Sequence, residues 1–180
     1  MRRVRFRLPG RDEVREGILE RDVVRSGGQR YSIESIRLVA PCTPSKLVCV
    51  GRNYAAHAAE LGNEVPERPL LFFKPPSAVI GPDEPIVLPA SDDVQYEAEL
   101  AVVIGRTARK VAESDALSHV LGYTCVNDVS ARDCQARRDQ QWTRAKSFDT
   151  FCPMGPCLVV DRAMEPNALP IRSKLNGKLM

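Results

Sequence analysis

Alternating charged and apolar residues open the chain. Arg3, Arg5 and Arg7 are interleaved with apolar side chains from Val4 to Leu8, and a period of two is typical of a half-exposed strand. Pro9-Gly10 and Ser26-Gly27-Gly28 then provide turns. We therefore predict a small β-meander over residues 1–45. Its arginines are mixed with acidic residues, which favours a solvated face over an anion-binding arm.

The pattern after residue 45 predicts short strands and helices. Strands are expected over 47–50, 96–104, 122–129 and 151–160, and helices over 54–61, 114–121 and 132–142. Prolines recur through 62–92, which excludes long helices and central strands there. At the end, Asn176-Gly177 is a hairpin signal, but only three residues follow it. We expect this terminal strand to lack its partner, as if a longer protein continued beyond residue 180.

Length and composition indicate an ordinary globular protein. The 180 residues suit one domain, with 43% hydrophobic and 27% charged residues. The net charge of +3 is too small to indicate nucleic-acid or membrane binding. There is no apolar run of ~18 residues and no signal-peptide pattern at the start. We expect a cytoplasmic protein that binds neither nucleic acid nor membrane.

Cysteine and histidine patterns exclude several classes of site. The six cysteines show no CxxC spacing, and the chain has only two histidines, which excludes a zinc finger or c-type haem site. The cysteines lie mostly in apolar runs and are interpreted as small buried residues. His119 lies among apolar residues and no GxSxG motif is present, so a serine or cysteine nucleophile is disfavoured.

Candidate chemistry centres on three acidic residues. Glu97 and Glu99 belong to one apolar strand, so both carboxylates project from the same side, with Cα atoms ~7 Å apart. Asp128 follows a second apolar strand. Crowded carboxylates on a half-buried face call for a cation, and oxygen ligands favour Mg²⁺ or Mn²⁺, with Ca²⁺ as an alternative. From spacing alone, a solvent-facing edge strand explains Glu97 and Glu99 equally well.

Other polar residues could complete a catalytic site. His57 and Glu60 share one face of the predicted helix, either as a general-base dyad or as a surface pair. Lys146, in a polar loop, could stabilise an oxyanion or simply be solvated. Arg132 and Gln135 follow Asp128 closely, and Arg132 suits a substrate carboxylate through bidentate pairing.

Five ordered motifs carry a resemblance to a known family. They are VGRNYAAHAAELG, LFFKPPSAVIGP, YEAELAVVIG, GYTCVNDVSARDCQ and KSFDTFCPMGP. Together they resemble the fumarylacetoacetate hydrolase family, in particular its acylpyruvase and 2-hydroxyhepta-2,4-diene-1,7-dioate isomerase branch. The resemblance covers about residues 45–180, the N-terminal and central part of that catalytic domain. It implies domains at 1–45 and 46–180, and a β-rich α+β fold: a rolled mixed β-sandwich, incomplete at the C-terminus and usually a homodimer.

The resemblance also implies roles for the candidate residues. Glu97, Glu99 and Asp128 match the metal-binding carboxylates, with Mg²⁺ or Mn²⁺ as the usual metal. His57 and Glu60 match a dyad on a mobile lid that activates water or moves a proton. Lys146 matches a lysine beside the metal, and Arg132 and Gln135 match substrate contacts. The family's namesake has another metal-binding aspartate where Arg52 and Asn53 stand here.

The function implied is hydrolysis or isomerisation of small 2-oxo or 1,3-dioxo acids, such as acylpyruvates or hydroxymuconates, through an enolate. Alternatives are an oxaloacetate decarboxylase or tautomerase, and a catalytically incomplete fragment that serves as a structural or assembly module. Relatives continue beyond the equivalent of residue 180 through a Thr-Gly-Thr-Pro-like segment that lines the active site.

Overall fold

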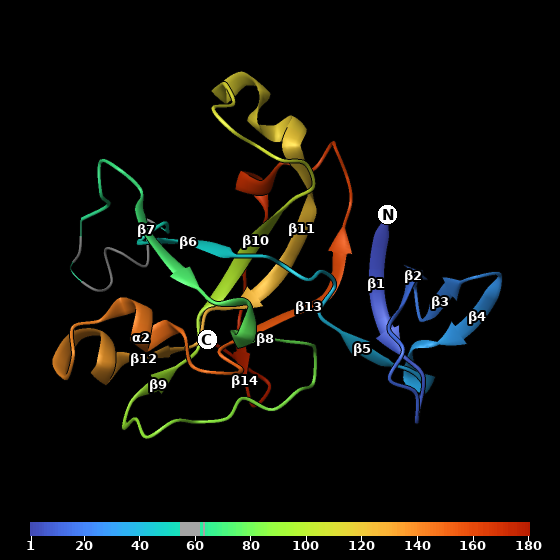
Figure 1. Ribbon diagram of the computed structural model, residues 1–180, viewed down its shortest axis with the longest axis horizontal. Coiled ribbons are helices and arrows are strands. Elements are labelled where there is room, and N and C mark those ends of the chain that lie inside the picture. Colours follow the sequence, from blue (N-terminus) through green and yellow to red (C-terminus); the bar gives the residue numbers. More distant parts are fainter. Residues whose placement is uncertain (55–61, 63) are drawn as a thin grey trace.

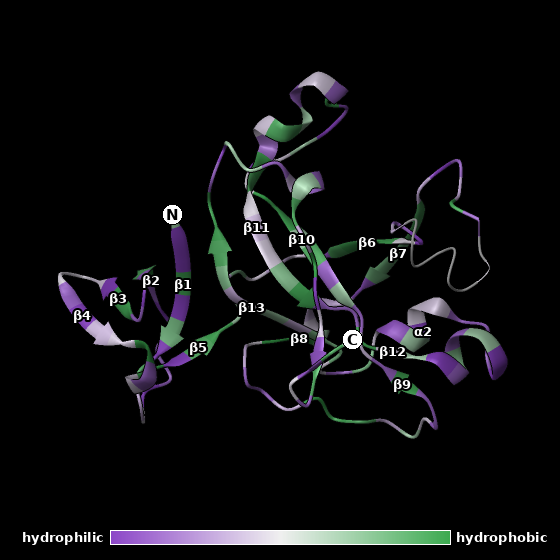
Figure 2. Ribbon diagram, turned by 180° about the vertical axis from the view of Figure 1, so that it is seen from behind, coloured by the Kyte–Doolittle hydropathy of each residue, from purple (hydrophilic) through white to green (hydrophobic). Residues whose placement is uncertain are grey.

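The N-terminal part is a β-meander (Figure 1). The computed structural model describes residues 1–54, 62 and 64–180, and the predicted helix over 54–61 lies almost entirely outside them. The meander comprises β1 (Arg2–Arg7), β2 (Arg15–Glu20), β3 (Val23–Ser26), β4 (Gln29–Ser32) and β5 (Arg37–Val39). Val4 and Phe6 are buried while Arg3, Arg5 and Arg7 are partly exposed, which confirms the predicted alternation. Figure 2 shows it as hydrophilic and hydrophobic bands along β1.

The remaining strands and helices are short. The strands are β6 (Leu47–Gly51), β7 (Leu70–Lys74), β8 (Val79–Ile80), β9 (Val94–Gln95), β10 (Ala98–Ile104), β11 (Val120–Asn127), β12 (Ser130–Ala131), β13 (Cys152–Val159), β14 (Lys174–Leu175) and β15 (Lys178–Leu179). The α-helix α2 spans Trp142–Lys146, and a π-helical turn spans Asp133–Arg137. Turns of 3₁₀ helix span Ile33–Ser35, Pro76–Ala78, Glu113–His119 and Pro166–Ala168.

One mixed sheet connects the two parts of the molecule. In the described chain, nine strands form this sheet along the path β10-β11-β13-β1-β2-β3-β4, with β5 and β8 paired to β1 and β13. The pair β13–β8 is parallel and the other pairs are antiparallel. Arg2 and Arg3 of β1 lie opposite Val159 and Leu158 of β13, so the meander continues the main sheet. Further two-stranded ribbons pair β6 with β7, β9 with β12, and β14 with β15.

The helix predicted over 132–142 is wrong in extent. The Arg138 N–H donates to the carbonyl of Asp133 at 2.6 Å, which widens the turn to a π-helix. Gln140 then adopts a φ of 54°, a left-handed conformation that no α-helix continues through. A new helix, α2, begins only at Trp142. The segment predicted as helix over 114–121 is likewise a 3₁₀ helix that ends at His119.

The expectation of an unpaired C-terminal strand is also wrong for the described structure. Lys174 lies opposite Leu179, and Leu175 lies opposite Lys178. Asn176 and Gly177 have φ values of 51° and 80°, as a two-residue hairpin turn requires. The three residues after the turn therefore suffice for a minimal return strand.

The buried core is divided into three clusters. One lies under the meander, and the others lie beneath β12 and α2 and along β13. The strand predicted over 96–104 begins two residues later, at Ala98, and the one predicted over 122–129 is shifted to 120–127. Consequently Glu97 lies just before β10 and Asp128 just after β11. No helix in the described part of the chain is both long and apolar enough to cross a membrane.

Candidate functional site

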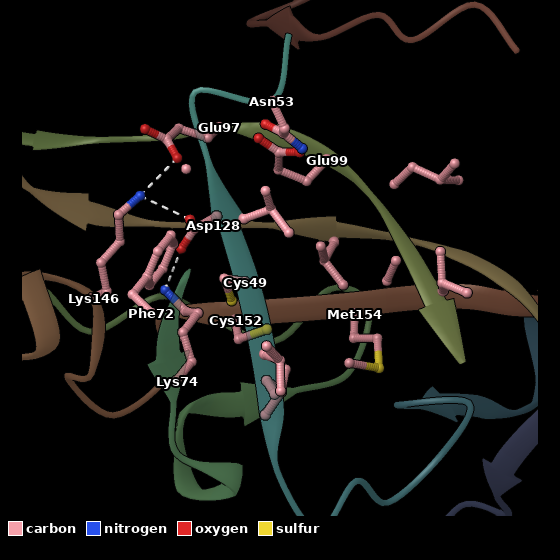
Figure 3. Close-up of a pocket in the computed structure, with 18 of the residues that line it drawn as sticks. Cys49, Asn53, Phe72, Lys74, Glu97, Glu99, Asp128, Lys146, Cys152 and Met154 are labelled. Carbon is pink, nitrogen blue, oxygen red and sulfur yellow. Dashed lines mark hydrogen bonds and ion pairs between the residues drawn. The ribbon is translucent and has the colours of Figure 1, made fainter. Parts of the chain in front are cut away.

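Three carboxylates meet where β10 begins and β11 ends. The antiparallel register places Ala98 opposite Asn127. The backbone N–H of Asp128 donates to the carbonyl of Glu97 at 2.9 Å, which joins the two strand ends. Figure 3 shows Glu97, Glu99 and Asp128 on the same side of the pocket. The two strand ends thus bring Glu97 and Asp128 close enough to share Lys146, while the role of the three acids as metal ligands stays a prediction.

Two buried lysines contact these carboxylates (Figure 3). Lys146, the last residue of α2, places Nζ 2.7 Å from Glu97 Oε2 and 2.7 Å from Asp128 Oδ2. Lys74, the last residue of β7, places Nζ 2.6 Å from Asp128 Oδ1 and 3.1 Å from the carbonyl oxygen of Val129. Each lysine is 2% exposed. Charges buried this deeply are tolerated only when they are paired, so both lysines depend on the acids.

Arg132 belongs to the same network. Its guanidinium contacts Glu97 Oε1 and donates to Gln135 Oε1 at 2.7 Å and to Gln95 Oε1 at 3.0 Å. Each of its three nitrogens thus has a partner, and one N–H remains on each terminal nitrogen. Gln95 and Gln135 therefore fix the orientation of the arginine that was predicted to bind substrate.

The pKa values of Asp128 and Glu99 are shifted in opposite directions. Burial alone would raise the pKa of Asp128, but the ammonium groups of Lys74 and Lys146 outweigh burial and hold it below its ordinary value. Burial, followed by the charge of Glu97, raises the pKa of Glu99 to about 7, although hydrogen bonds from Asn53 and Tyr54 oppose the rise. Among the described residues no salt bridge reaches Glu99. Of the three acids, Glu99 is therefore the one without a cationic partner in the described part of the chain.

Aromatic packing positions Lys146. Its Nζ lies 5.1 Å from the centroid of the Phe72 ring, a cation–π contact. Phe72 in turn meets Trp142, the first residue of α2, with ring centroids 5.6 Å apart. A Cβ on Gly51 would lie 2.9 Å from Trp142 Cζ3, so glycine is needed there for the indole to approach β6.

The donor set suits a hard divalent cation. All three acids offer oxygen, and Glu99 is a half-buried carboxylate beside two like charges, a repulsion that a cation would relieve. The Lys146 ammonium already holds a positive charge between Glu97 and Asp128. The described residues do not contain three acidic, histidine or cysteine side chains gathered as tightly as a bound metal would gather them. Metal binding at Glu97, Glu99 and Asp128 therefore stays a prediction that the chemistry of the site supports.

The predicted site residues fall into two groups. The structure brings together Glu97, Glu99, Asp128, Lys146, Arg132 and Gln135, all of which line one cavity of about 2470 Å³. His57 and Glu60 lie outside the described residues.

Sequence reasoning missed four residues that contact this network: Lys74, Asn53, Tyr54 and Gln95. In the sequence, Lys74 stands out as the single charged residue at the end of the apolar run LLFFK. A lysine in such a run has to find a buried partner.

Comparison with known proteins identifies the family. The profile described as "Fumarylacetoacetate (FAA) hydrolase C-terminal" matches residues 46–180. This chain belongs to the fumarylacetoacetate hydrolase family. The chain is 46% identical over 153 residues to a mitochondrial oxaloacetate tautomerase of Xenopus laevis, covering 83% of this chain and 48% of the frog protein. The chain spans from 48% to 70% of the length of the curated relatives it matches at this level, and about half the length of the tautomerases.

Solved structures confirm the β-rich fold of this fumarylacetoacetate hydrolase family member. A 5-carboxymethyl-2-hydroxymuconate delta-isomerase from Mycobacterium smegmatis has a TM-score of 0.87 at 42% identity, over 99% of this chain and 74% of its own. A maleylpyruvate hydrolase from Sphingobium sp. SYK-6, in complex with manganese(II) and pyruvate, has a TM-score of 0.74 at 29% identity, over 93% and 70%. The family thus includes isomerases, hydrolases and tautomerases.

Proposed function

We propose that this chain forms the metal-binding part of an enzyme that acts on small 2-oxo or 1,3-dioxo acids, as a hydrolase or isomerase that proceeds through an enolate. The observation that carries the proposal is the convergence of Glu97, Glu99 and Asp128, with Lys146 between two of them. A bound Mg²⁺ or Mn²⁺ would supply a Lewis acid that polarises the 2-oxo group of the substrate. Ca²⁺ is the alternative ion.

The relatives support the substrate class. The two similar structures are named for enzymes of a hydroxymuconate and of maleylpyruvate, and the second contains manganese(II) and pyruvate. Each substrate name denotes a small carboxylic acid with an oxo or hydroxyl group. We extend this class to the present chain because its acids, lysines and Arg132 surround one cavity.

We propose a separate role in catalysis for each polar residue of the site. Arg132, oriented by Gln95 and Gln135, would offer its remaining N–H groups to a substrate carboxylate. The Lys146 ammonium would stabilise negative charge that develops on the substrate oxygen. We assign proton movement to the predicted dyad of His57 and Glu60. Whether that dyad activates water or only transfers a proton decides between hydrolysis and isomerisation.

Oxaloacetate tautomerisation is the second candidate function. Two relatives at 46% and 48% identity, from Xenopus laevis and Bos taurus, are named mitochondrial oxaloacetate tautomerases. Keto–enol exchange of oxaloacetate requires the same polarised 2-oxo group but no water. Decarboxylation of oxaloacetate is the alternative to its tautomerisation. We also propose that the protein forms a homodimer and that its chain divides into domains at 1–45 and 46–180.

Metal analysis and a substrate panel test these alternatives. The chain would be assayed with acetylpyruvate, a hydroxymuconate and oxaloacetate, with and without Mg²⁺ or Mn²⁺. A version extended at its C-terminus to the length of its relatives would be assayed beside it. We expect Glu99→Ala to abolish metal-dependent turnover and Glu113→Ala, at an exposed glutamate, to leave it intact. Turnover that survives Glu99→Ala would show that the carboxylate site is misassigned.

A substitution in the dyad separates the two reaction classes. We expect His57→Ala to abolish C–C hydrolysis but to spare tautomerisation if the dyad activates water. Loss of both reactions would instead assign His57 to proton transfer in enolate formation. If the extended chain shows turnover and the 180-residue chain does not, the result would support the hypothesis that the 180 residues are a catalytically incomplete module.

A further inference from the structure

Sulfur-containing side chains form a group beside the carboxylates (Figure 3). Cys49 belongs to β6, and Cys152 and Met154 lie two residues apart on β13, so the last two share one face of that strand. All three line the same cavity as the acids. Cys42 joins them, because its thiol donates to the Met154 thioether, with Sγ and Sδ 3.5 Å apart. The three cysteines are free thiols, and the proposed reaction uses none of these sulfurs.

Cys49 and Cys152 are the two thiols nearest the carboxylates. Cys152 is 1% exposed, and Cys49 is half-buried on the inner face of β6. Burial is the largest cause that raises the pKa of Cys49 to about 12 and that of Cys152 to about 11. A negative charge on Cys152 would raise the pKa of Cys49 further, so the two thiols lie close enough to interact. Both are protonated at neutral pH, and a ligand that binds them as thiolates has to displace their protons.

A buried ammonium group favours the ionised form of both thiols. Lys74 lowers the pKa of Cys49 and of Cys152, against the larger effect of burial, and Lys146 acts on Cys49 in the same direction. The Asp128 carboxylate has the opposite effect, but it is paired with both lysines. Two thiolates around a monovalent cation carry one net negative charge, which a neighbouring ammonium group stabilises.

We propose that Cys49 and Cys152 bind a soft monovalent cation of the Cu⁺ class between their two sulfur atoms. Thiolate and thioether ligands select Cu⁺, whereas carboxylate oxygens select hard ions such as Mg²⁺. Cu⁺ accepts two thiolates in a linear arrangement. Structural Zn²⁺ requires about four ligands, and the described part of the chain gathers no three cysteine, histidine or acidic side chains around one point. The pair of thiols therefore suits a two-coordinate ion.

Binding at this pair exchanges protons for the metal. Two S–H bonds break, their protons pass to solvent, and two Cu–S bonds form. Copper stays in the +1 state throughout, so the step needs neither an oxidant nor a reductant. The cavity would thus sort cations by softness, with hard ions at the acids and soft ions at the neighbouring thiols. This goes beyond the proposed function, because it concerns residues that the reaction does not use.

Anaerobic titration with Cu⁺ tests the proposal. The full chain would compete for Cu⁺ with a chromophoric Cu⁺ chelator, which a single thiol cannot outcompete. We expect the unmodified chain to take a single Cu⁺, and Cys49→Ala and Cys152→Ala each to lower its affinity at least about tenfold. The matched controls are Cys125→Ala, at an exposed thiol, and Cys134→Ala, at a thiol buried in another core cluster. Both should leave the affinity unchanged.

Several outcomes would overturn the assignment. They are a chain that takes no Cu⁺ from the chelator, a Cys49→Ala variant that keeps the full affinity, and loss of binding in Cys125→Ala. Circular dichroism shows whether Cys152→Ala folds, and if it does not, Cys49→Ala at the less buried thiol decides. X-ray absorption at the copper edge gives a second measurement, in which two sulfur neighbours support the site and oxygen or nitrogen neighbours overturn it. Neither measurement depends on turnover, so the proposed function can fail separately.

Discussion

Replacing Glu99 by glutamine should stabilise the metal-free protein at alkaline pH. Burial and the charge of Glu97 raise the pKa of Glu99 from 4.5 to about 7 in the fold. One pKa unit corresponds to about 1.4 kcal/mol, so the rise from 4.5 to about 7 makes the ionised carboxyl cost at most about 3.5 kcal/mol. Because Glu99 is only half-buried, solvent screening reduces the expected gain for Glu99→Gln to about 1–3 kcal/mol.

The sign of the pH dependence follows from linkage. Below pH 4.5 the carboxyl is protonated in both the folded and the unfolded chain, and it adds no pH-dependent cost. Between pH 4.5 and about 7 the unfolded chain is ionised while the folded chain keeps its proton, so the wild type loses stability as pH rises. The advantage of Glu99→Gln should therefore grow over this window and level off above it.

Urea denaturation at pH 4, 6 and 8 in the presence of a chelator measures this advantage. Glu97→Gln is the matched control, because Glu97 is paired with both Lys146 and Arg132. Glutamine removes the negative charge that Arg132 contacts and leaves Lys146 with Asp128 as its remaining acidic partner, so we expect a loss of about 1–3 kcal/mol at pH 8. An advantage of Glu99→Gln that is equal at pH 4 and pH 8 would refute the reasoning, as would a stabilising Glu97→Gln.

Three further substitutions test the architecture. Gly51→Ala should displace Trp142, 2.9 Å from the new Cβ, and lower the free energy of unfolding by about 1–3 kcal/mol, as thermal unfolding would show. Phe6→Ala, at a fully buried ring, should cost about 3–5 kcal/mol in urea denaturation, and an unchanged midpoint would contradict the core assignment. Arg132→Lys loses the fixed fork that Gln95 and Gln135 hold, so steady-state kinetics should show a raised KM for 2-oxo acids, and an unchanged KM would remove Arg132 from substrate binding.

The sequence predicted the strands well because their signal is local. Val4 and Phe6 alternate with arginines, and β10, β11 and β13 are apolar runs, although β10 and β11 begin two residues away from their predicted starts. The helical segments were predicted less well. Their ends depend on tertiary contacts such as the hydroxyl of Ser91, which donates to Asp133 at 2.5 Å from 42 residues away, and no local pattern reports such a contact.

The candidate site was likewise predicted only in part. The acids were found because Glu99 lies within an apolar strand and Glu97 and Asp128 directly adjoin apolar strands, where a charge requires an explanation. Lys74 was missed, although it closes an apolar run in the same way. Its acidic partner, Asp128, lies 54 positions away and is reached only in the folded chain. Its partner therefore could not be predicted from spacing along the chain.

The pairing of β1 with β13 has a consequence for how the chain folds. β5 pairs with Arg5–Arg7, but Arg2 and Arg3 on the same edge of β1 have to wait for residues about 155 positions later before they are hydrogen-bonded, and contacts so distant in sequence slow folding. During synthesis, the meander can form its own strand pairs at once, but the start of β1 exposes an unsatisfied edge until β13 leaves the ribosome. Conditions that prolong this interval should favour aggregation through that edge, which the finished sheet covers.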